Sequence, residues 1–75
     1  MKLSFDNGVN FFDTAEKYGN GIAETIMGKA IKELGFKRKD IVVTTKIYKI
    51  GEGPNDGFMS RKHLIEGVIA SLGRL

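Results

Sequence analysis

The chain has 75 residues, a formal net charge of +3 and no cysteine. Its length allows at most one small domain, and the missing cysteines exclude disulfides, thiolate metal sites and cysteine nucleophiles. The single histidine excludes a cluster of histidine metal ligands. Hydrophobic residues make up 41% of the chain and charged residues 28%, which is typical of a globular protein rather than a disordered one.

The charge pattern and the lack of long apolar runs exclude several kinds of partner. The basic stretch 37–39 is followed at once by Asp40, and the basic stretch 61–63 is followed by Glu66. A nucleic-acid-binding surface would instead collect its basic residues on one face. No apolar run approaches the ~18 residues that cross a bilayer, and Lys2 is not followed by the apolar core of a secretory signal. We therefore expect a cytoplasmic protein with no nucleic-acid partner and no direct membrane insertion.

The first half of the chain predicts a helix end, a strand and a full helix. Residues 1–7 are expected to end a helix, with Gly8 at its C-terminal cap. The apolar run 9–12 predicts a short buried strand. Residues 22–34 change to helical spacing, and Gly35 is expected to cap that helix. Its apolar stripe comprises Ile22, Ala23, Ile26, Met27, Ala30, Ile31 and Leu34.

The second half predicts another strand, a loop and a last helix. The β-branched run 41–45 has little polar alternation, which favours a parallel strand covered on both faces. Residues 50–58 are rich in glycine and polar residues and predict a loop. Ser60 is expected to be the N-cap of the last helix. The apolar stripe of that helix comprises Leu64, Ile65, Val68, Ile69, Leu72 and Leu75.

The order strand–helix–strand predicts an α/β fold with one parallel βαβ unit, in which residues 1–75 form a single region. Two parallel strands leave two open edges, and the helices have only a narrow sheet to cover. The chain therefore resembles a slice of a larger α/β architecture. An alternative is that it assembles with a second copy of itself and buries those edges in a homo-oligomer.

Three side chains that can perform acid–base chemistry are expected at the carboxyl ends of the strands. Asp13 follows the first strand and Lys46 the second, and neighbouring strands lie only ~4.8 Å apart. Tyr18 lies in the following connection, where it can fold back over the same place. An ammonium group favours the phenolate form of a nearby tyrosine, and a carboxylate keeps that ammonium charged. Such a trio can protonate a carbonyl oxygen while hydride reaches the carbonyl carbon.

Simpler interpretations of these residues remain open. The segment 13–16 also fits a helix capping box, Lys46 a solvated surface residue, and Tyr18 the cover of an apolar edge. The segment 19–21 has two glycines, but the third glycine of a phosphate-binding loop is missing and no strand precedes it, so we expect a flexible turn.

Two further charged or titratable residues receive only structural interpretations. His63 lies in the first turn of the last helix, where we expect an exposed histidine without a catalytic role. Glu24 lies early in its helix, where a negative charge interacts favourably with the helix dipole.

Three motifs in order resemble the aldo-keto reductase family. Residues 8–24 read GVNFFDTAEKYGNGIAE and resemble its signature around the second barrel strand, where a tyrosine follows an aspartate by five residues. Residues 42–48 read VVTTKIY and resemble its third strand, which ends in a lysine. Residues 59–75 read MSRKHLIEGVIASLGRL and are similar to the third helix of the branch that contains voltage-gated potassium channel β-subunits.

This resemblance implies a (β/α)8 TIM barrel, of which the chain would cover about the second and third βα units. It implies an oxidoreductase that uses NADPH to reduce aldehydes or ketones, with Tyr18 as general acid, Lys46 as the group that lowers its pKa, and Asp13 orienting the lysine beside the nicotinamide. A barrel needs ~250 residues. We therefore expect a fragment that is inactive alone, with a small carbonyl substrate or a channel protein as the partner of the full protein.

Overall fold

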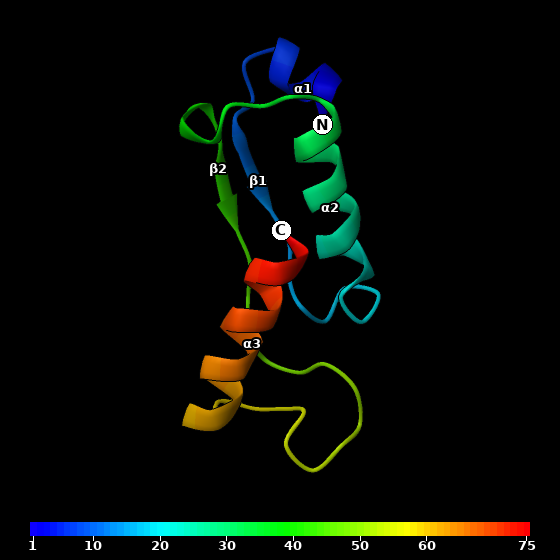
Figure 1. The fold of residues 1–75 in the computed structure, drawn as a ribbon, viewed down its shortest axis with the longest axis vertical. Coiled ribbons are helices and arrows are strands. Elements are labelled where there is room, and N and C mark those ends of the chain that lie inside the picture. Colours follow the sequence, from blue (N-terminus) through cyan, green and yellow to red (C-terminus); the bar gives the residue numbers. More distant parts are fainter.

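The computed structural model describes residues 1–75 and contains a two-stranded parallel sheet with its main helices on one side (Figure 1). Its elements, in chain order, are α1 (Lys2–Asp6), β1 (Phe11–Asp13), α2 (Ile22–Glu33), the 3-10 turn η1 (Arg38–Asp40), β2 (Val42–Thr44) and α3 (Arg61–Arg74). Pairing of β1 with β2 in parallel confirms the predicted βαβ arrangement. None of the helices combines the length and apolar character needed to cross a membrane.

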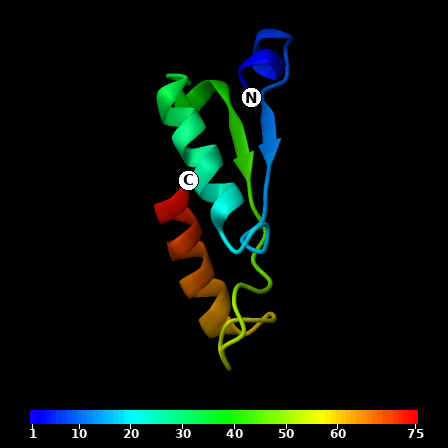
Figure 2. The same ribbon diagram turned by 90° about the vertical axis from the view of Figure 1, so that its right-hand side faces the viewer.

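Only one face of the sheet is covered. Side chains alternate between the two faces of a strand, so Phe12 and its neighbour Val43 face the helices, whereas Phe11 and Val42 face the other way. Phe11 is 55% exposed and Val42 45% exposed. The expectation that the second strand is covered on both faces is therefore wrong for this chain, because α2 and α3 both lie on the same side (Figure 2).

The two long helices approach each other and the neighbouring segments through small and polar residues. The buried positions of α2 are Glu24 and Gly28, and those of α3 are His63, Gly67 and Ser71. A Cβ atom on Gly28 would lie 2.2 Å from the carbonyl oxygen of Arg74, so a glycine is required for this approach. Many members of the predicted apolar stripes are exposed, including Ile22, Ile26, Ile65, Val68, Ile69 and Leu72. Part of each stripe nevertheless lines a cleft between the helices and β2, namely Ile31, Val68, Leu72 and Leu75.

Local signals at the helix ends are confirmed. Gly35 follows α2 with a φ of 67°, and the amides of Gly35 and Phe36 donate to the carbonyls of Lys32 and Ile31. This is the Schellman arrangement, which satisfies two otherwise unpaired carbonyls. The Ser60 hydroxyl accepts a hydrogen bond from the His63 amide at 3.0 Å, as expected of an N-cap.

The hydrophobic core is small. Ala15 and Ile41 are its buried apolar residues. At the amino-terminal edge of the sheet, the ring of Phe36 lies 4.6 Å from that of Phe5 and 6.3 Å from that of Phe12, measured between centroids. This aromatic cluster holds α1 against the sheet, and the carboxyl edge is left to polar contacts.

Candidate active site

The carboxyl edge of the sheet brings Asp13 and Lys46 into direct contact. Asp13 ends β1 and pairs in register with Thr44, the last residue of β2. Lys46 comes two residues later, and its ammonium group donates hydrogen bonds to the Asp13 carboxylate and, at 2.6 Å, to the Thr14 carbonyl. The Thr44 hydroxyl donates to the other carboxylate oxygen of Asp13 at 2.6 Å. The predicted meeting of these two strand ends is thus confirmed.

These contacts determine the charge state of Asp13. The hydrogen bond from Lys46 and, after it, the one from Thr44 hold the pKa of Asp13 below its ordinary value of 3.8. Asp13 is therefore ionised at neutral pH, and its negative charge keeps the ammonium of Lys46 in place. Both side chains are 49% exposed, so the pair stays accessible to a ligand on the open face of the sheet.

Tyr18 lies over the same ammonium group. The Lys46 Nζ atom is 5.5 Å from the centroid of the Tyr18 ring, within the usual range of a cation–π contact. The Tyr18 amide donates to the Ala15 carbonyl, and the next three residues have positive φ angles, which turn the chain back toward α2. The ring is 52% exposed. The structure therefore brings all three predicted side chains together on one surface.

The local geometry excludes the simpler interpretation of the segment 13–16. The N-cap of α2 is Gly21, which has no side chain to act as a cap, so Asp13 does not cap a helix. Lys46 is not an isolated solvated residue either, since it has three polar or aromatic neighbours. The segment 19–21 forms a turn, as expected.

Directly behind this edge lies a buried pair that the sequence analysis missed. The side chain of Glu16 is fully buried, and its Oε1 atom lies 2.7 Å from Nε2 of His63, which is 3% exposed. The Tyr48 amide donates to the same oxygen at 2.5 Å. The expectation of an exposed His63 is therefore wrong. The available signal was the N-cap at Ser60, which fixes the start of α3, but nothing in the sequence links His63 to a residue 47 positions earlier.

A second buried carboxylate joins α2 to α3 and to the segment that follows β2. Glu24 is fully buried and accepts hydrogen bonds at 2.6 Å from the Thr45 hydroxyl and from Nε of Arg74. Burial raises its pKa, but these hydrogen bonds outweigh that effect and leave the pKa of Glu24 below its ordinary value of 4.5. The expected interaction of Glu24 with the helix dipole is therefore only part of its role, because Glu24 also binds Thr45 and Arg74.

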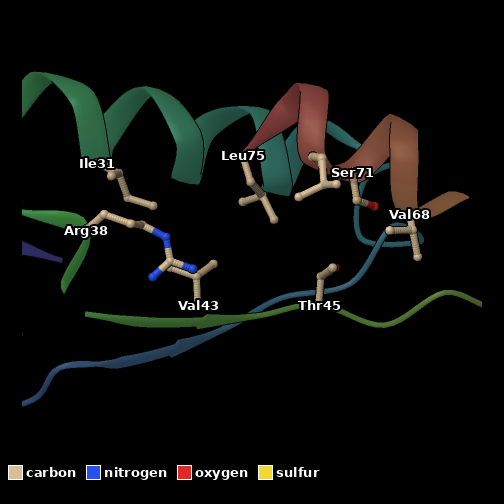
Figure 3. Close-up of a pocket in the computed structure, with 8 residues that line it drawn as sticks. Ile31, Arg38, Val43, Thr45, Val68, Ser71 and Leu75 are labelled. Atoms are coloured by element: carbon tan, nitrogen blue, oxygen red, sulfur yellow. The ribbon is translucent and has the colours of Figure 1, made fainter. Parts of the chain in front are cut away.

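A cleft between the helices and β2 does not belong to this site (Figure 3). It has a volume of about 220 Å³ and is lined by Ile31, Arg38, Val43, Thr45, Val68, Ser71, Leu72 and Leu75. Val43 and Thr45 point toward the helices, whereas Asp13 lies on the opposite face of the sheet. The cleft is therefore a packing space between layers, and the candidate chemistry lies on the open face.

Comparison with known proteins decides the family. The profile of the aldo/keto reductase family matches residues 1–75, the whole chain. The chain belongs to this family. The resemblance of the three motifs to aldo/keto reductases is thereby confirmed, and the parallel βαβ unit is consistent with an α/β member of that family.

Curated relatives of this aldo/keto reductase chain are potassium channel subunits by name. A probable voltage-gated potassium channel subunit beta from Arabidopsis thaliana is 64% identical over 70 residues, covering 93% of this chain and 21% of that protein. The probable subunit beta from Oryza sativa subsp. japonica is 59% identical with the same coverage. A putative subunit beta from Schizosaccharomyces pombe is 56% identical over 78 residues, covering 100% of this chain and 22% of that protein. The chain spans about a fifth of the length of these relatives.

Proposed function

We propose that residues 1–75 form about the second and third βα units of a (β/α)8 barrel and carry the acid–base part of the active site of an NADPH-dependent oxidoreductase. The observation that carries this proposal is the Lys46 ammonium, held between the Asp13 carboxylate and the Thr14 carbonyl and covered by the Tyr18 ring. Active sites of such barrels lie at the carboxyl ends of the strands, which is where this group is found.

Each residue then has a distinct part in reducing an aldehyde or ketone to an alcohol. The Tyr18 hydroxyl donates its proton to the carbonyl oxygen. The Lys46 ammonium stabilises the phenolate that forms, since an opposite charge nearby favours the charged form. Asp13 holds that ammonium in place through a direct hydrogen bond. Because the phenolate exists only after proton transfer has begun, the Lys46 charge acts mainly on the transition state.

The surface around Asp13 fits the nicotinamide end of the cofactor. Asp13 and Lys46 are both half exposed on the uncovered face of the sheet, so a flat polar ring can lie beside them without displacing a packed side chain. Asp13 would hold the cofactor there. When bound, NADPH supplies the hydride that the carbonyl carbon accepts.

The test is the substitution Tyr18→Phe in the full-length protein, assayed by NADPH oxidation with a panel of small aldehydes and ketones. We expect kcat to fall by about 10²-fold or more, because general acid catalysis contributes roughly 10²–10⁴ to a rate. The dissociation constant of NADPH should stay nearly unchanged. Tyr48→Phe, which removes the other tyrosine hydroxyl of this chain, is the matched control. Unchanged turnover in Tyr18→Phe would remove Tyr18 from the mechanism.

The names of the three curated relatives described above favour a second candidate function. Each is named a voltage-gated potassium channel subunit beta. In this alternative, the full protein is a regulatory module that binds a channel and uses bound NADPH as a sensor rather than for turnover. Co-purification with a membrane channel, together with negligible carbonyl reduction by the unmodified full-length protein, would favour the module. Rapid turnover without a channel partner would favour the enzyme.

A further inference from the structure

The buried pair of Glu16 and His63 has no part in the chemistry proposed above, yet it lies directly behind it. Glu16 is three residues after Asp13 and two residues before Tyr18. Its backbone amide donates to the Lys46 carbonyl at 3.1 Å, while its side chain meets the Tyr48 amide and the His63 ring. One residue thus connects the segment that carries Tyr18 to the segment that carries Lys46 and to α3.

Two groups from other segments meet one carboxyl oxygen of Glu16. Oε1 of Glu16 accepts a hydrogen bond from the Tyr48 amide, which is a donor only. The same oxygen lies 2.7 Å from Nε2 of His63, within hydrogen-bonding distance. Oε2 of Glu16 is buried without any hydrogen-bond partner. The carboxyl group is thus held by the Tyr48 amide and the His63 ring, both on segments other than its own.

The space around the carboxylate leaves it little freedom. A Cβ atom on Gly67 would lie 3.1 Å from Oε2 of Glu16 and 2.7 Å from a methyl carbon of Ile47, so α3 reaches the carboxylate only because residue 67 is a glycine. Beyond Glu16, in contrast, the chain is less constrained. The residues 17–20 are all exposed, and the turn after Tyr18 offers no buried side chain to anchor the phenol.

From this geometry we propose that Glu16 and His63 form a positioning unit, which fixes the segment carrying Tyr18 so that its phenol stays above the Lys46 ammonium. Lys46 has its own anchors, the Asp13 carboxylate and the Thr14 carbonyl. Loss of the buried pair would therefore leave the ammonium in place and release the phenol. The expected effect on kcat rests on the proposed role of Tyr18 as the general acid. The anchoring of the segment that carries Tyr18 does not depend on that role.

The kinetic test compares disruptive and conservative variants of both partners in the full-length protein. Glu16→Ala and His63→Leu each remove the contact, and we expect kcat to fall by about 10-fold or more, since a misplacement of 1 Å can cost on the order of 10²-fold. The KM of NADPH should change by less than about twofold. Glu16→Gln keeps an acceptor oxygen and His63→Gln keeps a donor nitrogen, so both should retain kcat within about threefold.

Matched controls and a double variant complete this test. Lys62 is exposed in the same helical turn as His63, and Lys62→Gln should leave kcat unchanged. The double variant Glu16→Ala/His63→Leu should be no slower than the slower single variant, because two partners of one contact are not additive. Additive losses, or conservative variants as slow as the disruptive ones, would overturn the proposal. If Glu16→Ala does not fold, the two His63 variants decide the question.

Hydrogen–deuterium exchange provides a readout that does not depend on turnover. The amides of Tyr18 and Asn20 donate to the carbonyls of Ala15 and Lys17 and should be protected. In His63→Leu we expect faster exchange in peptides covering residues 14–21 and unchanged exchange in the middle of α2. Unchanged exchange in residues 14–21 would overturn the positioning unit even if Tyr18→Phe is inactive. Faster exchange there with an active Tyr18→Phe would instead refute the proposed function alone.

Discussion

Removal of the Arg74 guanidinium should destabilise the protein strongly, although Arg74 is the last residue of α3 and its side chain is partly exposed. Its Nε atom donates to Oε2 of Glu24, and a second nitrogen donates to the Ser71 hydroxyl at 3.3 Å. Glu24 is 0% exposed and Arg74 is 22% exposed. The substitution Arg74→Met keeps the length of the side chain but leaves a buried carboxylate with only the Thr45 and Ser71 hydroxyls as side-chain partners.

The expected loss is about 3 kcal/mol in the free energy of unfolding. Breaking a buried ion pair by removing one partner costs about 3–5 kcal/mol, and the partial exposure of Arg74 favours the low end of that range. The exposed pair of Lys62 and Glu66 on the same helix provides the scale for comparison, because both side chains are more than half exposed. Lys62→Met should therefore cost less than about 1 kcal/mol.

The pH dependence of this loss has a definite sign. The pKa of folded Glu24 lies below its ordinary value of 4.5, so the stability that its ionised form contributes is present above that value and is lost as the pH falls through the folded pKa. In Arg74→Met, the hydrogen bond and the positive charge that lower the pKa of Glu24 are lost, so the pKa of Glu24 is higher in the variant than in the unmodified protein. The stability difference between the two proteins should therefore narrow as the pH falls from the pKa of Glu24 in the variant toward its lower pKa in the unmodified protein.

The assay is urea unfolding of the full-length protein and its variants, followed by far-UV circular dichroism at neutral pH and at several acidic pH values. A difference between wild type and Arg74→Met that is no larger than that for Lys62→Met would refute the reasoning. So would a difference that stays constant as Glu24 becomes protonated, since the loss would then not come from an uncompensated carboxylate.

Two further predictions concern packing and the open face of the sheet. Gly28→Ala should destabilise the protein by about 1–3 kcal/mol in the same urea assay, because the new methyl group would lie 2.2 Å from a backbone oxygen of α3. Gly73→Ala, which meets nothing within 4 Å, should be neutral or stabilising by about 0.5 kcal/mol, and equal effects at the two sites would contradict this explanation. Lys46→Met should raise the pKa of Asp13 toward 3.8, since the largest lowering contact is removed, as measured by a carboxyl-carbon NMR titration. An unchanged Asp13 titration would mean that the ammonium is not its main partner.

Features that depend on neighbouring residues in the sequence were predictable, and features that depend on distant partners were not. The caps at Gly35 and Ser60 follow from local rules, and the meeting of Asp13 with Lys46 follows from the geometry of parallel strands. The strand limits were only approximate: 9–12 and 41–45 were predicted, whereas pairing defines Phe11–Asp13 and Val42–Thr44. Strand ends are set by hydrogen bonds to a partner, which hydrophobicity does not report.

The sequence analysis did not predict which helix positions are most deeply buried. Periodicity locates an apolar stripe, part of which lines the cleft beside β2, but the face with the most buried positions carries glycines and polar residues in both helices. In α2 that face is marked by Gly28 and in α3 by Gly67, and each glycine stands four residues after a buried polar residue, Glu24 and His63 respectively. Their partners, Arg74 and Glu16, are 50 and 47 residues away in the sequence. No local pattern encodes such pairs, and η1 was missed because its basic residues indicate only a solvated surface.

The residues of the candidate site are held in place by backbone pairing that continues beyond the ends of β1 and β2. After Asp13, the Thr14 amide donates to the Thr44 carbonyl and the Glu16 amide donates to the Lys46 carbonyl, which is the spacing of a parallel ladder. Along this extension, polar side chains lie on two different faces. Asp13 contacts Lys46 on the open face, whereas Glu16 contacts His63 in the buried layer between the sheet and the helices. The same few residues thus hold an accessible charged pair on one side and a buried anchor on the other. Side chains on such a ladder are fixed by backbone hydrogen bonds rather than by a long loop, so a chain with little hydrophobic core can still hold them in register.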